Sequence, residues 1–317
     1  MIVPQRDDVS PSTMADYEDV LNLWERGTGD PEISDVNRDT VVAFRNWLSS
    51  SPFKRGKKLV KGSKRSPSTV NRIMRELHVI MSPCWPADRQ DPSGLGLCPF
   101  FKWPRSLARQ RKLPFVFTGS NLDQLYLHAD AYPRRIGCRA TPINEARLWR
   151  TALVLGLNCG ARTWDLLNLL WDDIRLDDPS PYLHGSVVFG ARKTNKLHRI
   201  PLNECAAQHL RDLKRRPIVS KEPHRVFPGF YKRKTFYKAW TAICEAAGVT
   251  GTFECMRKTC VTQHNSIVWQ SGYWLSGHVE PGVFGYYDNP SDRIFDSVYR
   301  LQNPPEFIKG MNSLIVG

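Results

Sequence analysis

The chain has 317 residues, a length that predicts two domains of ordinary size, each able to bury a hydrophobic core. Its 45 Lys and Arg residues outnumber its 31 Asp and Glu residues, and the resulting net charge of +14 favours a polyanionic partner. A hydrophobic content of 41% excludes disorder as the main state. The longest apolar run, near residues 152–157, is far shorter than the roughly 18 residues of a membrane span, and the start of the chain lacks the apolar segment of a secretion signal. We therefore expect a soluble, intracellular protein with no membrane partner.

The eight cysteines are scattered along the chain. They form no CxxC pair and no Cys/His cluster at zinc-finger spacing, so the sequence predicts neither a disulfide framework nor a metal site. We interpret them as reduced, packed thiols, and we expect no cofactor.

Charge changes abruptly along the first half of the chain. Residues 1–50 hold 4 basic and 10 acidic side chains, whereas residues 51–120 hold 15 basic and 3 acidic ones. Apolar residues recur at helical spacing in 13–27, 39–50 and 67–81, which predicts an N-terminal helical domain, and the segment 98–104 is expected to pack on it. Asn71 is expected on the outer face of the third helix, beside its arginines. The basic side chains expected to lie along phosphates are Lys54, Arg55, Lys57, Lys58, Lys61, Lys64, Arg65, Arg72 and Arg75.

Residues 106–120 are basic, contain proline and end in a helix N-cap signal, which is typical of a linker. We therefore predict a helical domain over 1–112 and a second domain over 121–317. In the second domain we expect helices at about 120–130, 143–158, 162–171, 204–216, 232–248, 254–270 and 290–302. Between them, residues 181–202 carry two β-like runs around a polar tip, which indicates a hairpin.

Five segments of the second half carry a resemblance: GLNCGARTWDLLNLLWDDI (156–174), GARKTNKLHRIPL (190–202), FECMRKTCVTQ (253–263), LSGH (275–278) and GYYDN (285–289). Their order resembles that of the tyrosine recombinases, also called the phage integrase family. The spacing agrees as well, with 31 residues from Arg162 to Lys193, 95 from Arg162 to Arg257, 21 from Arg257 to His278 and 9 from His278 to Tyr287. The resemblance implies a mainly helical (α+β) fold, in which a helical core-binding domain precedes a catalytic domain that carries a small β-hairpin.

Cutting and rejoining DNA without ATP requires that the energy of the phosphodiester be kept in a covalent bond to the protein. Planar, permanently charged guanidinium groups suit the oxygens of the transition state, and the leaving 5′ oxygen needs a proton. The resemblance implies that Tyr287 is the nucleophile and forms a 3′-phosphotyrosyl bond. It further implies that Arg162 and Arg257 hold the phosphate, that Lys193 protonates the leaving oxygen, and that His278 donates to a nonbridging oxygen.

Some positions leave alternatives open. Tyr286 competes with Tyr287 for the nucleophile's role, and the nine-residue offset from His278 favours Tyr287. Glu254 stands where the family usually has His; its carboxylate could accept the tyrosine proton, be turned away from the site, or pair with a neighbouring cation. Asp165 is expected to orient the site. The hairpin cations Arg192, Lys196 and Arg199, together with Lys258, are interpreted as DNA contacts.

The resemblance thus implies a site-specific recombinase that binds double-stranded DNA as a tetramer on two sites and is located in the cytoplasm on DNA. Recombination of mobile elements is the expected role, and the reaction can be integration, excision, inversion or dimer resolution. The alternatives are a recombinase-derived DNA-binding protein that no longer cuts, and a type IB topoisomerase that acts as a monomer. A general RNA-binding protein would explain only the charge. The predicted helix 290–302, with apolar Ile294, Phe295, Val298, Tyr299 and Leu301, is expected either to dock on a neighbouring protomer or to pack within its own chain.

Overall fold

The computed structural model describes residues 9–52, 54–55, 58–59, 63–87, 94–108, 115–132, 146–178, 181–191, 196–230, 232–275 and 290–316. The chain forms two compact units, Met1–Lys112 (unit 1) and Leu113–Gly317 (unit 2). Each unit has its own hydrophobic core. The prediction of a mainly helical fold with a small β-hairpin is confirmed.

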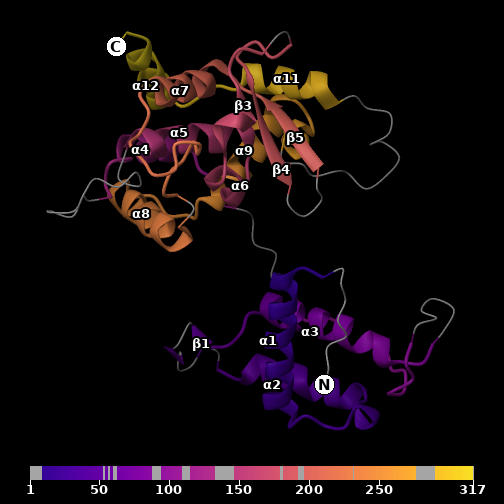
Figure 1. Ribbon diagram of the computed structural model, residues 1–317. Coiled ribbons are helices and arrows are strands. Elements are labelled where there is room, and N and C mark those ends of the chain that lie inside the picture. Colours follow the sequence, from indigo (N-terminus) through magenta and orange to yellow (C-terminus); the bar gives the residue numbers. More distant parts are fainter. Residues whose placement is uncertain are drawn as a thin grey trace. The chain divides into compact units, whose positions relative to one another are not determined.

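Unit 1 is built on three helices, α1 (Pro11–Thr28), α2 (Arg38–Ser50) and α3 (Pro67–Met81), with short 3-10 turns at Ile33–Asp35 and Ser82–Cys84 (Figure 1). The sequence explains where these helices begin. Ser10, Asn37 and Ser66 each accept a hydrogen bond from a backbone N–H of the first turn. In α1 and α3 a proline follows the capping serine, where its missing N–H is not needed.

The core of unit 1 is aromatic and aliphatic. Trp24 of α1 meets Phe44 of α2 edge to face, with the ring centroids 5.1 Å apart, and both side chains are fully buried. The apolar face of α3 closes this core through Leu77 and Met81. The expectation that 98–104 packs on the domain is confirmed, because Phe101 and Trp103 lie against this core.

Two features of unit 1 were not predicted. The segment 53–65, which carries many of the basic side chains, contains a short antiparallel ribbon in which β1 (Lys54–Arg55) pairs with β2 (Lys58–Leu59), because backbone pairing does not require side chains that pack. The placement of Asn71 on the outer face of α3 was wrong. Asn71 is buried, and its side chain exchanges two hydrogen bonds with the backbone of Leu107, at 2.9 and 2.8 Å.

Unit 2 holds the remaining elements. Its helices are α4 (Gly119–Leu127), α5 (Ala146–Cys159), α6 (Thr163–Leu167), α7 (Glu204–Arg215), α8 (Arg233–Ala246), α9 (Glu254–Ile267), α10 (Ser271–Leu275), α11 (Pro290–Arg300) and α12 (Pro305–Val316). The strands are β3 (Ile174–Arg175), β4 (Ser186–Ala191) and β5 (Lys196–Pro201), and a 3-10 turn spans Trp171–Asp173. The helix expected over 162–171 is therefore shorter than predicted.

The hairpin predicted within 181–202 is present as β4 and β5, which pair from Ser186↔Pro201 to Ala191↔Lys196. The two-residue strand β3, which the sequence analysis missed, pairs with β4 and completes a three-stranded antiparallel sheet in the order β3-β4-β5 (Figure 1). In β5, Ile200 is buried while the preceding Arg199 is exposed, as expected for neighbours on opposite faces of a strand.

Helix α5 forms the centre of unit 2 and is buried from Thr151 through Cys159. Helices α7 and α9 pack on it, and Gly156 lets α9 approach closely, since a Cβ there would lie 3.2 Å from Cβ of Met256. The unpredicted helix α12 lies beside α7 and also contacts α4 (Figure 1).

Helix α11 packs within its own unit. Ile294, Val298 and Leu301 are buried in the core, and Ser297 shares a hydrogen bond of 2.8 Å with His264 of α9. The helix thus packs within its own unit in this single chain, and docking on a neighbouring protomer stays a prediction.

The seven cysteines in the described residues are free thiols. Among the same residues, none of the helices has the length and apolar character needed to cross a membrane. Nor do those residues bring together three or more His, Cys, Asp or Glu side chains in an arrangement that could bind a metal ion.

Candidate functional site

The first predicted arginine follows a sharp end of α5. Gly160 has φ +58°, a left-handed conformation that glycine adopts without strain, and a Cβ there would lie 2.9 Å from Sγ of Cys260 on α9. Arg162 comes two residues later as the N-cap of α6. Its side chain is 49% exposed and forms an ion pair of 3.8 Å with Asp165, one turn into the same helix. Arg162 is therefore tethered on one side and open to solvent on the other.

The second predicted arginine contacts the same turn at Gly160. Arg257 lies in α9, is only 8% exposed, and donates a hydrogen bond of 2.6 Å from Nη1 to the carbonyl oxygen of Gly160. Burial lowers the pKa of its guanidinium, and so does the positive charge of Arg162, while Glu254 and Asp165 oppose the shift. Two arginines far apart in sequence thus lie close enough for their charges to interact. Such a pair attracts an anion, because an anion relieves the repulsion between the two cations.

Glu254 is the first residue of α9, where the helix dipole favours a negative charge. Its Oε2 accepts a hydrogen bond of 3.1 Å from the hydroxyl of Thr163, the residue that follows Arg162. The residue is exposed, and its charge favours the charged form of Arg257. Glu254 therefore lies beside the arginine pair, so a carboxylate occupies one side of the candidate anion site.

A histidine that the sequence analysis did not single out also lies at this site. His198 of β5 is half-buried, and its Nε2 is 3.2 Å from the carbonyl oxygen of Leu275, the last residue of α10. Its pKa is lowered first by burial and then by the nearby charges of Arg257 and Arg162, against the opposing effect of its backbone hydrogen bonds. The alternation of β5 could have placed His198 on the inner face with Ile200, but nothing in the sequence indicates its partner on α10.

Several predicted residues lie outside the described residues: Lys193, His278 and the competing tyrosines Tyr286 and Tyr287. The structure does place the described ends of the two segments that carry them. One segment joins Ala191 to Lys196, which pair across the hairpin, and the other follows Leu275. Since His198 of β5 contacts Leu275, these two parts of the chain lie side by side near the arginine pair.

The predicted DNA contacts of unit 1 differ in whether the protein itself holds their side chains. Arg65 donates from Nη1 to Oγ of Ser51 at 2.8 Å and lies over the ring of Trp47, so it holds the end of α2. Arg72 pairs with Glu76 at 2.9 Å, whereas Lys64 and Arg75 are exposed. For Lys54, Arg55 and Lys58 the structure describes only the strand backbone, and Lys57 and Lys61 lie outside the described residues.

Arg75 also lines a pocket of about 190 Å³ that contains two further arginines, Arg45 and Arg105. Arg45 donates from Nη1 to the backbone oxygen of Arg105 at 3.0 Å. Both of these arginines were missed in the sequence, because neither lies in the basic segment 53–65 or on α3. The complete lining is Arg45, Asn71, Met74, Arg75, His78, Trp103, Pro104, Arg105 and Ser106.

The predicted DNA contacts of unit 2 also differ in their surroundings. Arg199 is held by the protein itself, with an ion pair of 2.6 Å to Asp178, a hydrogen bond to Ser186, and the ring of Tyr182 at 4.2 Å. Lys258 is exposed on α9, directly after Arg257. Lys196 is described only by its backbone, and Arg192 lies outside the described residues.

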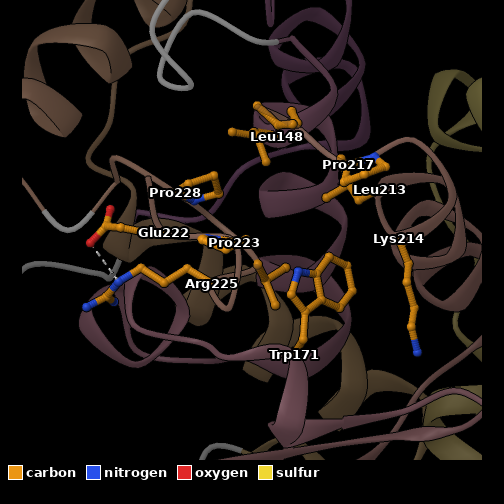
Figure 2. Close-up of a pocket in the computed structure, with 11 residues that line it drawn as sticks. Leu148, Trp171, Leu213, Lys214, Pro217, Glu222, Pro223, Arg225 and Pro228 are labelled. Atoms are coloured by element: carbon orange, nitrogen blue, oxygen red, sulfur yellow. Dashed lines mark hydrogen bonds and ion pairs between the residues drawn. The ribbon is translucent and has the colours of Figure 1, made fainter. Parts of the chain in front are cut away.

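A second pocket, of about 250 Å³, lies in unit 2 (Figure 2). Its lining is mostly proline and apolar side chains, including Leu148 and Trp171, with one ion pair of 3.2 Å between Arg225 and Glu222. None of the predicted catalytic or DNA-binding residues lines it. The candidate functional site of unit 2 is therefore the arginine pair.

Comparisons with known proteins support the resemblance of unit 2 to the phage integrase family and the fold of the chain. Residues 117–269 match the model of the phage integrase family. The chain is similar in structure to the Tn1549 transposon integrase in complex with transposon right end DNA, with a TM-score of 0.61, 14% identity, and coverage of 99% of this chain and 96% of that one. It is also similar to a lambda integrase dimer bound to a COC′ core site, with a TM-score of 0.56, 15% identity, and coverage of 86% and 90%. A third similar structure is a lambda integrase tetramer bound to a Holliday junction, with a TM-score of 0.57, 15% identity, and coverage of 89% of this chain and 75% of that one. No curated protein sequence matches the chain significantly.

Proposed function

Because unit 2 contains a domain of the phage integrase family of tyrosine recombinases, we propose that this chain cuts and rejoins DNA at specific sites through a phosphotyrosyl intermediate. The observation that carries the proposal is the pair of Arg162 and Arg257, one exposed and one buried, beside the turn at Gly160. A scissile phosphate bound between them would develop its extra negative charge against two fixed cations. The buried guanidinium is already oriented by Gly160, so little reorganisation is needed when the charge develops.

In the proposed cleavage step, the DNA strand is transferred from its 5′ oxygen to a tyrosine. The hydroxyl oxygen of Tyr287 attacks phosphorus, its proton passes to the carboxylate of Glu254, and the bond from phosphorus to the 5′ oxygen breaks. The ammonium group of Lys193 gives a proton to the departing 5′ oxygen, while His278 donates a hydrogen bond to a nonbridging oxygen. Rejoining reverses each transfer, with a 5′ hydroxyl as the attacking group. No external source of energy is required, because the phosphotyrosyl ester retains the energy of the broken bond.

The DNA partner is supported by charge and by the solved neighbours, which include integrases bound to DNA as a dimer and as a tetramer. In this proposal unit 1 binds backbone phosphates through Lys64, Arg75 and the pocket formed with Arg45 and Arg105, and four copies assemble on two DNA sites. Lys258 and the hairpin cations Arg192 and Lys196 contact the backbone near the cut. Arg199 is also proposed to contact DNA, through a guanidinium that forms an ion pair with Asp178.

The experiment begins with a binding site, selected with the full-length protein from a pool of random duplexes. A nick placed next to the cutting position lets the cut fragment escape, so a covalent protein–DNA product accumulates. We expect the parent protein and Tyr286→Phe to form this product and Tyr287→Phe to form none. If Tyr286→Phe alone abolishes it, the nucleophile is Tyr286.

One observation favours a second candidate function, a DNA-binding protein that does not cut. Glu254 places a carboxylate beside the arginine pair, where it competes with a phosphate for the same cations. In that case the parent protein binds the selected duplex and yields no covalent product at any pH from 6 to 9. A monomer that relaxes supercoiled plasmid without a specific site would instead identify a topoisomerase.

A further inference from the structure

His198 lies at a junction that the proposed chemistry depends on. It is on the inner face of β5, its backbone is opposite Phe189 of β4, and its ring reaches the last carbonyl of α10. The charges of both Arg162 and Arg257 act on it. His198 thus belongs to the strand that follows Lys193, and its ring contacts the helix that precedes His278. It also lies close enough to the arginine pair for their charges to act on it.

The contact with Leu275 fixes the state of the ring. A carbonyl oxygen only accepts hydrogen bonds, so Nε2 of His198 must carry the proton in this contact. The neutral ring then leaves Nδ1 without a proton, and the neighbouring guanidinium charges disfavour adding one. His198 is therefore a donor to Leu275 through Nε2, and the lowered pKa of its ring favours the neutral form.

The two ends of α10 are held differently. Its start is fixed to α9, because Ser271 Oγ donates to the carbonyl oxygen of His264 at 2.8 Å and Gly272 N donates to Oδ1 of Asn265 at 2.8 Å. Its last residue, Leu275, is joined instead to the sheet through His198. Loss of this bond would remove a hydrogen-bonded tie between β5, which begins just after Lys193, and the end of α10.

We propose that His198 is a positioning residue, which anchors the base of the β4–β5 hairpin to α10 so that Lys193 is delivered to the leaving oxygen. Lys193 is five residues before His198 and two residues beyond Ala191, the last residue of β4. The inference rests on the proposed function and adds to it a residue that acts through the hairpin. The main effect of its loss is expected on the step in which the 5′ oxygen receives a proton.

The test compares two variants with the parent protein on the nicked duplex. His198→Phe keeps the size of the ring without the donor, while His198→Gln keeps an N–H at the position of Nε2. We expect His198→Phe to form the covalent product at least tenfold more slowly and His198→Gln to stay within threefold of the parent. The matched control is His184→Phe, since His184 is also half-buried in unit 2 but lies against Tyr299, and it should cleave at the parental rate.

A second substrate separates positioning from a general loss of structure. Sulfur in place of the bridging 5′ oxygen leaves without a proton, so a defect in delivering Lys193 should disappear on that substrate. We expect His198→Phe to come within threefold of the parent there, with an unchanged melting temperature and DNA affinity. An equal defect on both substrates, a parental rate for His198→Phe, or an equal loss in His198→Gln overturns the inference. Absence of covalent product from the parent protein on both substrates refutes the proposed function instead.

Discussion

Replacing Gly160 with alanine tests the turn on which both arginines depend. Alanine at φ +58° is strained by about 1 kcal/mol, and its methyl group would lie 2.9 Å from Sγ of Cys260, an overlap that costs about 1 to 3 kcal/mol in a packed core. We therefore expect Gly160→Ala to lower the free energy of unfolding of unit 2 by about 2 to 4 kcal/mol. Cleavage should also slow, because the carbonyl of Gly160 holds Arg257.

A double-mutant cycle with Cys260→Ala separates the two costs. Cys260→Ala alone should cost about 1 kcal/mol for the deleted buried sulfur, but it removes the atom that the new methyl group meets. The remaining contact, 3.6 Å to Cβ of Cys260, is ordinary, so the double variant should lose about 1 to 3 kcal/mol less than the sum of the single losses. The assay is hydrogen exchange of the α5 and α9 amides in the full chain, since the two units need not unfold together. Additive losses would refute the steric part of this reasoning.

Three further predictions concern titration, charge and a buried amide. Burial lowers the pKa of His264 to about 4 from an ordinary 6.5, so the unfolded chain binds one more proton between these values. Stability should then fall by about 3 kcal/mol as the pH drops from 7 to 4, and urea melts of His264→Gln should lack this component. Glu254→Gln keeps an acceptor for Thr163 without the charge, so anisotropy titrations should show about threefold tighter DNA binding at low salt, a gain that disappears in high salt. Asn71→Ala leaves the N–H and C=O of Leu107 without their partner and should destabilise unit 1 by about 2 kcal/mol, seen as faster exchange of the α3 amides; unchanged exchange would contradict it.

The sequence predicted the helices of unit 1 well because their ends are chemically marked. Ser10, Asn37 and Ser66 are strong N-caps, and prolines at Pro11 and Pro67 occupy first-turn positions. The strands β1, β2 and β3 have two residues each and were missed, because two residues carry no periodic pattern. Asn71 was misplaced for a related reason: periodicity ranks polar residues as exposed and contains no information about a backbone partner 36 residues away.

For the candidate site, the sequence indicated which arginines matter but not how each is held. Motif order and spacing identified Arg162 and Arg257, and the structure brings their charges together. Arg199 and Arg65 belonged to the same class of basic residues in the sequence, yet Asp178 and Tyr182 surround one and Ser51 and Trp47 surround the other. Such partners come from distant parts of the chain, so composition and periodicity cannot reveal them. His198 was missed for the same reason, since its proposed role depends on a contact with the backbone of α10 that the sequence does not reveal.

The packing of α11 bears on how assembly could influence the chemistry. This helix follows the segment that contains Tyr287, and its apolar side is buried in its own unit through Ile294 and Val298, with Leu301 buried directly after the helix. Ser297 joins it to His264 of α9, two turns beyond Arg257 on the same helix. Moving α11 out of its own unit without a replacement would expose these side chains and leave the buried ring of His264 without this partner, a cost of several kcal/mol. Assembly on DNA should therefore either leave α11 in place and use other surfaces of unit 2, or exchange α11 between protomers so that an equivalent pocket buries the same side chains.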